Sequence, residues 1–187
     1  RDPIEGIAWV SSLPSHIASE LLDRFGPEVP EFLAASNHRA PLTVRVNTAR
    51  VSRDALKTRL EDEGVNSTPT KRSPWGLIIS QTANLQTLDS FKEGLFEIQD
   101  ESSQLCAALM RGEEGIVVDL CAGAGGKSLA HAAIRQDTRV HWALDVRPKA
   151  LRQLQIRAQR AQATHIRTQR IYPKSPKIKG ISPNSAH

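Results

Sequence analysis

The feature that most constrains the fold is an apolar run that ends in an aspartate and passes directly into a glycine-rich loop. Residues 116–120 read Ile-Val-Val-Asp-Leu, and residues 121–127 read Cys-Ala-Gly-Ala-Gly-Gly-Lys. A short β-branched run of this kind indicates a buried strand of a parallel sheet. Glycines let the backbone turn sharply off the strand and approach a ligand closely. A helix is predicted from Lys127 to Arg135, and its N-terminus would favour negative charge at the loop.

The loop completes neither of the two common phosphate-binding motifs. A P-loop requires a glycine five residues before Gly126, where this chain has Cys121, although Gly126 and the next two residues fit the end of that motif. A dinucleotide fingerprint begins with Gly123 and Gly125, but its third glycine is replaced by Ser128. The remaining interpretation is a nucleoside-type cofactor such as S-adenosylmethionine, with its methionine part over the loop.

A second strand, predicted over residues 139–145, ends in Asp145, 19 residues after Gly126. In related sheets an acidic residue near this spacing binds the ribose hydroxyls of the cofactor. Asp145 is therefore the expected ribose contact, with a capping role at the strand end as the alternative. A helix predicted over 148–163 and a third strand opening at 165–170 complete a strand–loop–helix–strand–helix order, which is typical of a doubly wound parallel sheet.

The N-terminal part of the chain predicts short helices and then a small α+β unit. Helices are expected over residues 15–25, 30–36, 52–63 and 101–110, and strands over 41–47, 76–80 and 95–99. Apolar and polar residues alternate in 41–47, which indicates a strand buried on one face. Residues 41–99 therefore form a ferredoxin-like unit, similar in shape to an RNA-recognition domain. Its central strands lack the aromatic residues that stack bases, so a packing and positioning role is favoured.

Single residues on the predicted helices carry further expectations. Phe32 and Leu33 are expected to face inward on their helix, and Cys106 to lie in the core beside Leu105 and Leu109. Cys121 suits a tight loop as a small residue better than it suits a nucleophile. The histidines show no spacing that indicates a catalytic triad or a metal site.

The charge of the chain is unevenly distributed. The net charge is +5, but residues 139–187 hold 11 basic residues and one acidic residue, whereas residues 1–138 hold 14 basic and 19 acidic residues. A basic C-terminal segment after an acidic body indicates a polyanion partner or an atypical C-terminal segment.

Composition excludes several classes of protein. With 39% hydrophobic and 24% charged residues the chain can form a core, so general disorder is excluded. No apolar run approaches the roughly 20 residues of a membrane span, and no N-terminal signal segment is present. The two cysteines, Cys106 and Cys121, have neither metal-ligand spacing nor the number that a disulfide scaffold needs. A cytoplasmic protein without metal or membrane association is expected.

Four sequence blocks resemble one known family, the Sun/Fmu (RsmB-like) S-adenosylmethionine-dependent RNA (cytosine-5-)methyltransferases. Residues 118–129, Val-Asp-Leu-Cys-Ala-Gly-Ala-Gly-Gly-Lys-Ser-Leu, look like the family's cofactor loop, Asp-x-Cys-Ala-x-x-Gly-Gly-Lys-[Thr/Ser]. The other blocks are residues 41–48, 94–105 and 144–151. The resemblance covers roughly residues 10–168 and implies that rRNA, or alternatively tRNA, is the substrate.

Carried over residue by residue, the resemblance implies a set of cofactor contacts. These are Cys121, Ala122, Gly123, Ala124, Gly125, Gly126 and Lys127 in the loop, together with Asp145 at the ribose. Gln99 and Asp100 would lie near the active-site cleft, and the unit at 41–99 would position RNA.

The family's two cysteine motifs, Asp-Ala-Pro-Cys-Ser and Thr-Cys-Ser, are absent from the sequence, so no catalytic residue is assigned. In that family one cysteine thiolate adds to C6 of cytosine and the second assists product release. Residues 171–187 match nothing expected next. We therefore expect a truncated or frameshifted product with three strands of the catalytic sheet, and little activity of this chain alone.

The expected architecture is α/β with four parts: an N-terminal helical segment (1–40), the RNA-recognition-like unit (41–99), a partial Rossmann-like domain (100–170) and a disordered tail (171–187). Two alternatives remain open. One is a non-catalytic RNA-binding remnant, and the other is a different Rossmann-type nucleotide-binding protein.

Overall fold

The computed structural model describes residues 3–109, 115–135, 140–172 and 178. The chain forms two compact units, Arg1–Pro41 and Leu42–His187. Among the helices that the structure describes, none is long and apolar enough to cross a bilayer. The expected disordered tail over 171–187 lies outside the described residues, apart from Ile171, Tyr172 and Ile178.

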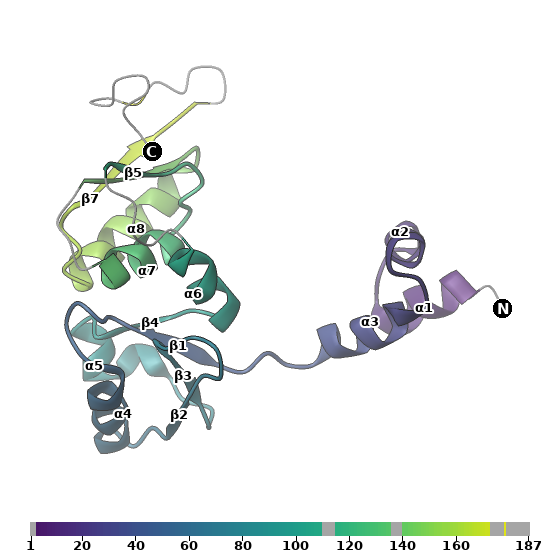
Figure 1. Cartoon of the computed structure of the whole chain (residues 1–187), viewed down its shortest axis with the longest axis horizontal. Coiled ribbons are helices and arrows are strands. Elements are labelled where there is room, and N and C mark those ends of the chain that lie inside the picture. Colours follow the sequence, from purple (N-terminus) through teal and green to yellow (C-terminus); the bar gives the residue numbers. More distant parts are fainter. Residues whose placement is uncertain (1–2, 110–114, 136–139, 173–177, 179–187) are drawn as a thin grey trace. The chain divides into compact units, whose positions relative to one another are not determined.

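The first unit consists of helices α1 (Pro3–Ser11), α2 (Ser15–Phe25) and α3 (Val29–Asn37), with the single-turn 3-10 helix η1 (Gly26–Glu28) between the last two (Figure 1). Helices α2 and α3 were predicted from the sequence, and α1 was not. Val29 and Leu33 are buried one turn apart on α3. The inward orientation predicted for Phe32 is wrong, because its ring is 54% exposed and stacks on Phe25 at a centroid distance of 6.2 Å.

The second unit begins with a four-stranded antiparallel sheet in the order β2-β3-β1-β4. Its strands are β1 (Thr43–Val46), β2 (Ser67–Pro69), β3 (Gly76–Ile79) and β4 (Phe96–Ile98), and its helices are α4 (Arg53–Asp62), η2 (Leu85–Thr87) and α5 (Asp89–Lys92). Helix α4 joins β1 to β2, and a short helical segment joins β3 to β4. This connectivity and strand order confirm the predicted ferredoxin-like unit. Strand β2 and helix α5 were not predicted, because they are too short to show a periodic pattern.

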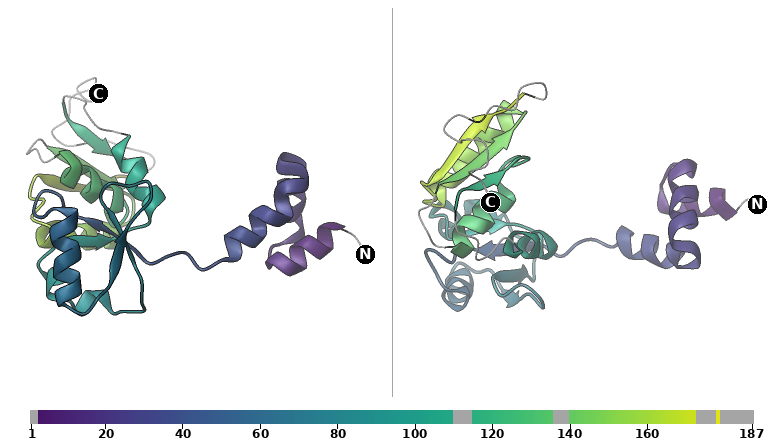
Figure 2. Two further views of the ribbon diagram at one scale, coloured as in Figure 1. Left: turned by 60° about the horizontal axis from the view of Figure 1, so that its bottom comes forward. Right: turned by 45° about the horizontal axis from the view of Figure 1, so that its top comes forward.

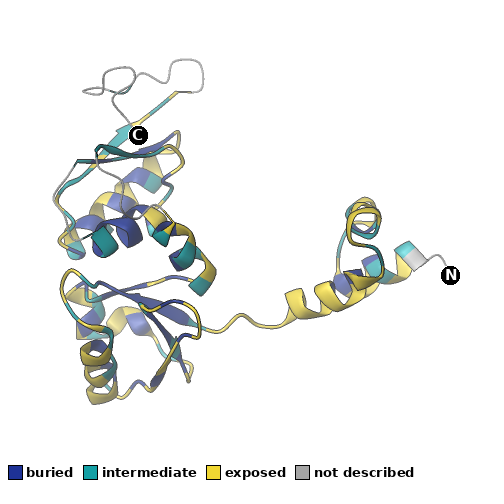
Figure 3. Ribbon diagram, viewed as in Figure 1, coloured by how far each residue is buried: buried dark blue, intermediate teal, exposed yellow. Residues whose placement is uncertain are grey.

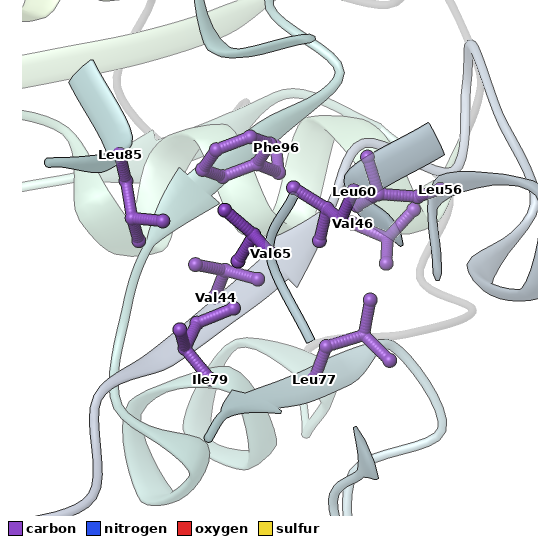
Figure 4. Packing of buried hydrophobic residues seen from close by; sticks show 9 residues of the cluster. All are labelled: Val44, Val46, Leu56, Leu60, Val65, Leu77, Ile79, Leu85 and Phe96. Atoms are coloured by element: carbon purple, nitrogen blue, oxygen red, sulfur yellow. The ribbon is translucent and has the colours of Figure 1, made fainter. Parts of the chain in front are cut away.

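One face of this sheet and helix α4 enclose an apolar core (Figure 4). Val44 pairs with Leu77 of β3 and with Ile98 of β4, so that β1 is the central strand of the core. Leu56 and Leu60 of α4 are fully buried on it. Ser52 caps the start of the helix, where its Oγ accepts a hydrogen bond from the N–H of Ala55 at 3.2 Å.

The prediction that β1 is buried on one face only is wrong. All four of its residues are buried, including Thr43 and Arg45. Helix α6 (Glu101–Ala108) packs against β1 from the side opposite to α4. The polar side chains therefore face a second layer of protein and not solvent.

The chain then forms a three-stranded parallel sheet in the order β5-β6-β7. Its elements are β5 (Val117–Asp119), α7 (Gly126–Arg135), β6 (His141–Asp145), α8 (Pro148–Arg160) and β7 (Ile166–Arg170). Helices α7 and α8 pack on β6, and α8 also contacts β7 (Figure 2). The Rossmann-like strand–helix alternation expected from the sequence is confirmed, with β5 at one edge of the described strands.

The buried residues of the second unit lie mainly in its strands and in the inward faces of α7 and α8 (Figure 3). Leu151, Leu154 and Ala158 are the buried residues of α8. The predicted core position of Cys106 is wrong, because Gln104 and Ala107 occupy the buried face of α6 and the thiol is exposed. The four-part division of the chain at residues 40, 99 and 170 stays a prediction.

Candidate functional site

The glycine-rich loop between β5 and α7 turns through two left-handed residues, Gly123 at φ +55° and Gly125 at φ +87°. The N–H of Gly125 donates to the carbonyl oxygen of Ala122 at 2.8 Å, which closes the turn. A Cβ atom on Gly125 would lie 2.5 Å from Cγ of Leu154 on α8. Glycine is therefore required at position 125 both by the backbone conformation and by the close packing of the loop on α8.

Asp119 holds the two ends of this loop together. One oxygen of its carboxylate accepts a hydrogen bond from the N–H of Cys121 at 3.2 Å, and the other accepts one from Oγ of Ser128 at 2.7 Å. Ser128 is fully buried in the first turn of α7. The last residue of β5 thus fixes where the helix begins, and the loop between them is held as a defined turn.

The second strand brings Asp145 directly to this loop. The N–H of Ala122 donates to the carbonyl oxygen of Leu144 at 2.9 Å, and the N–H of Gly123 donates to the carboxylate of Asp145 at 2.8 Å. The side chain of Asp145 is only 5% exposed. The structure therefore places Asp145 against the loop, at the carboxyl ends of β5 and β6, where open α/β sheets bind their ligands.

Arg147 contacts the same carboxylate three times. Its backbone N–H and its Nε donate to one oxygen at 2.8 and 3.0 Å, and its Nη2 donates to the other at 3.2 Å. The hydrogen bonds from this guanidinium, followed by those from the backbone N–H groups of Arg147 and Gly123, hold the pKa of Asp145 far below its usual range. Asp145 is therefore a carboxylate, and so a pure hydrogen-bond acceptor, throughout the physiological pH range.

Gln99 connects the ferredoxin-like sheet to the loop. Its Nε2 donates to the carbonyl oxygen of Gly126 at 3.0 Å, and its Oε1 accepts a hydrogen bond from Nε of Arg45 at 2.7 Å. Burial lowers the pKa of Arg45 to about 10, which still leaves its guanidinium charged at neutral pH. Of the two residues that the resemblance implied near the cleft, Gln99 contacts the loop and Asp100 caps α6 through the N–H groups of its first turn.

A second connection to the loop passes through buried charges. Glu97 on β4 accepts hydrogen bonds from Arg157 at 2.9 and 3.1 Å and from Arg160 at 2.6 Å. Arg157 also donates through Nη1 to the carbonyl oxygen of Ala124 at 2.7 Å. The loop is thus held at two points, directly by Gln99, which follows β4, and by Glu97 of β4 through Arg157. Neither link was predicted, because each joins residues far apart in the sequence and leaves no local pattern.

The predicted loop residues differ in exposure. Cys121, Ala124 and Lys127 are exposed, Ala122 and Gly125 are buried, and Gly123 and Gly126 are half-buried. The exposed face of the loop and the buried carboxylate beside it fit a nucleoside, since a pair of ribose hydroxyls needs acceptors and the loop lets a ligand approach its backbone. Within the described ranges, no group of three histidine, cysteine, aspartate or glutamate side chains could hold a metal ion.

A glycine-rich turn after the first strand of a parallel sheet, with a carboxylate at the end of the second, is the arrangement typical of Rossmann-like domains. Here such a domain follows a ferredoxin-like unit. The model of the RsmF/B-like methyltransferase ferredoxin-like domain matches residues 13–86.

Curated proteins of similar sequence are named as ribosomal RNA methyltransferases. The ribosomal RNA small subunit methyltransferase B of Citrobacter koseri is 34% identical over 116 residues, which make up 62% of this chain and 27% of that protein. The protein of the same name from Pseudomonas putida is 33% identical over 130 residues, which make up 68% of this chain and 29% of that protein. The chain therefore spans less than a third of the length of these relatives.

Solved structures show the same fold. The crystal structure of PH0851 has a TM-score of 0.82 and 25% identity, over 90% of this chain and 39% of that chain. A methyltransferase homolog protein from Pyrococcus horikoshii has a TM-score of 0.79 and 22% identity, over 90% of this chain and 56% of that chain. Together these matches confirm that the chain is related to the Sun/Fmu (RsmB-like) methyltransferase family.

Proposed function

We propose that this chain is part of an S-adenosylmethionine-dependent RNA (cytosine-5-)methyltransferase, with ribosomal RNA as the first candidate substrate and tRNA as the second. The observation that carries the proposal is the 2.8 Å hydrogen bond that joins the carboxylate of Asp145 to the N–H of Gly123. This bond supports the proposal because it holds a buried carboxylate, a group that can accept hydrogen bonds from hydroxyls, beside the loop that resembles the family's cofactor loop. The methyltransferase relatives support the reaction class.

In this proposal each part of the site has one task. Asp145 accepts hydrogen bonds from the ribose hydroxyls, and the exposed face of the loop from Cys121 to Lys127 lies under the methionine part of the cofactor. The N-terminus of α7 favours the carboxylate of that methionine, because its first N–H groups carry partial positive charge. When bound, S-adenosylmethionine supplies a methyl group activated by its sulfonium.

Methylation of cytosine at C5 in this family needs a cysteine thiolate. The 187 residues contain neither of the two family motifs that carry such a cysteine. Cys121 belongs to the cofactor loop and Cys106 lies on α6, and both thiols are exposed. We therefore assign cofactor binding and RNA positioning to this chain, which we place in the cytoplasm, and expect no methyl transfer by the chain alone. A methyl-transfer assay on ribosomal and transfer RNA with labelled cofactor tests this, and turnover would contradict it.

Cofactor binding is tested by ligand-dependent stability. S-adenosylmethionine at ten times its Kd is expected to raise the free energy of unfolding by about 1.4 kcal/mol, because only the folded chain binds it. The substitution Asp145→Asn is expected to abolish this shift, while Asp89→Asn on the exposed helix α5 should retain it. Stabilisation by NAD instead of S-adenosylmethionine would identify a different Rossmann-type nucleotide-binding protein.

A further inference from the structure

Every acceptor position on the carboxylate of Asp145 is occupied in this structure. A carboxylate offers about four lone-pair positions. Gly123 N–H and Arg147 Nη2 donate to one oxygen, and Arg147 N–H and Arg147 Nε donate to the other. Two of these four donors are backbone groups, and two belong to one guanidinium. A ribose with two hydroxyls needs two acceptor positions, so two of the present bonds must break before it can bind there.

We propose that Arg147 is a displaceable cap on this carboxylate and that a ligand with vicinal ribose hydroxyls binds by replacing its guanidinium. The inference rests on the proposed ribose-binding role of Asp145. It assigns to Arg147 a function that weakens cofactor binding and depends on the hydroxyls of the ligand.

The two kinds of donor differ in how easily they leave. The N–H groups of Gly123 and Arg147 are fixed by the loop and by the start of α8, so they stay with the carboxylate when a ligand binds. The guanidinium is attached through a flexible side chain, and the side chain of Arg147 is 68% exposed, whereas that of Asp145 is 5% exposed. An arginine with this exposure regains water when it moves away, so its removal from the carboxylate costs little.

The guanidinium also lies in the space that a ligand needs. Its Nη2 is 3.4 Å from the position that a Cβ atom on Gly123 would occupy, so it rests against the turn of the cofactor loop. A ribose bound to Asp145 has to lie against the same turn. The cap and the ligand therefore compete for one volume as well as for the same two acceptor positions.

This competition selects for ligand chemistry. Two hydroxyl groups restore both hydrogen bonds that the guanidinium gives up. A ligand without hydroxyls would leave the buried carboxylate with two fewer hydrogen bonds. A buried charged group that lacks hydrogen bonds raises the free energy of the complex. Such a ligand therefore does not displace the guanidinium, and the cap competes only with ligands that have ribose hydroxyls. In the unliganded protein it satisfies a carboxylate that burial would otherwise penalise.

The test compares Arg147→Ala with the unsubstituted chain in binding S-adenosylhomocysteine, measured by calorimetry. Removal of the cap is expected to tighten binding about two- to fivefold, which is the range that an exposed arginine contributes. The 2′,3′-dideoxy analogue of the ligand is expected to show no such gain. The gain for the parent ligand should shrink as salt is added, because the competing ion pair is screened.

Arg24→Ala is the matched control, since the side chain of Arg24 is 71% exposed and also pairs with a carboxylate, that of Glu20, and this variant is expected to leave both affinities unchanged. The Arg147→Lys variant should bind S-adenosylhomocysteine with an affinity between those of the unsubstituted chain and Arg147→Ala, because an ammonium group cannot reproduce the two parallel donors of a guanidinium. Equal or weaker binding of S-adenosylhomocysteine by Arg147→Ala would overturn the cap. An equal gain for the dideoxy analogue would also overturn it. If the unsubstituted chain binds no ligand while its fold is intact, the proposed cofactor site fails, and the cap fails with it.

Discussion

At the scale of single residues, the site depends on glycines that differ in what they permit. Gly125 has φ +87°, and a Cβ atom added to it would clash with Leu154. Its neighbour Gly126 has an ordinary helical backbone with room for a Cβ atom. A Cβ atom on Gly126 would meet Nε2 of Gln99 only at 3.7 Å, an ordinary van der Waals distance. The two adjacent glycines therefore respond differently to the same substitution.

Gly125→Ala is expected to lower the free energy of unfolding by about 1–3 kcal/mol, because the new methyl group meets Leu154 and the residue is forced into a left-handed conformation. Gly126→Ala is expected to be neutral or slightly stabilising, since alanine favours the helix that begins there. Urea unfolding of both variants measures the difference. Similar losses at both positions would show that the turn is not held as described.

At the scale of structural elements, the end of β4 and the residue after it, Gln99, determine how the loop is held. The side-chain amide of Gln99 is both acceptor and donor: it accepts a hydrogen bond from Arg45 and donates one to the carbonyl oxygen of Gly126. A glutamine has both functions in one group, which neither an aliphatic residue nor a carboxylate can reproduce. The ferredoxin-like sheet thus contributes directly to the shape of the proposed cofactor site.

Gln99→Leu is expected to lower the free energy of unfolding by about 1–3 kcal/mol, because Nε of the buried Arg45 loses its acceptor. Gln99→Glu should retain more stability, since a carboxylate still accepts from Arg45. Both variants lose the donor to Gly126 and are expected to bind S-adenosylhomocysteine more weakly. Calorimetry and urea unfolding separate the two effects, and unaltered affinity in Gln99→Glu would rule out positioning of the loop by this amide.

At the scale of the whole molecule, the basic residues of the C-terminal segment fall into two groups, those paired with acidic side chains and those exposed to solvent. Arg157 and Arg160 neutralise the buried Glu97, and Arg147 pairs with Asp145. Lys149 and Arg152 on α8 are exposed. Only part of the net positive charge that the sequence shows is therefore presented to a polyanion.

The exposed cations are expected to contact phosphates. Lys149→Ala and Arg152→Ala should each weaken binding of a ribosomal RNA fragment and reduce the slope of log K against log salt concentration by about 0.7–0.9, the value for one phosphate contact. Filter binding over a salt series measures this. Arg160→Ala serves as the contrast, since it should destabilise the fold by leaving Glu97 with one partner. A salt slope that is unchanged in both surface variants would exclude α8 from the RNA-binding surface.

The sequence by itself determined the order of the longer elements from residue 15 onward, the loop at residues 121–127 and the aspartate after the second strand. Those features depend on local periodicity and on residues near one another in the chain, and local patterns are visible in a single sequence. The elements that it missed, α1, β2 and α5, are short or lie at the chain end, where such patterns are weak. The inward orientation of Phe32 and the core position of Cys106 were wrong, because helical spacing alone does not show which face meets a neighbour.

Only the tertiary structure decided how the parts of the site are joined. Arg45 and Gln99 lie 54 residues apart, and Glu97 and Arg157 lie 60 residues apart. No local pattern reports contacts at such separations. Burial of Arg45 and Glu97 requires hydrogen-bond partners, and the fold supplies Gln99 for Arg45 and residues of α8 for Glu97. The sequence shows that Arg147 follows Asp145 by two residues, but only the folded loop shows that its guanidinium occupies the proposed ribose position.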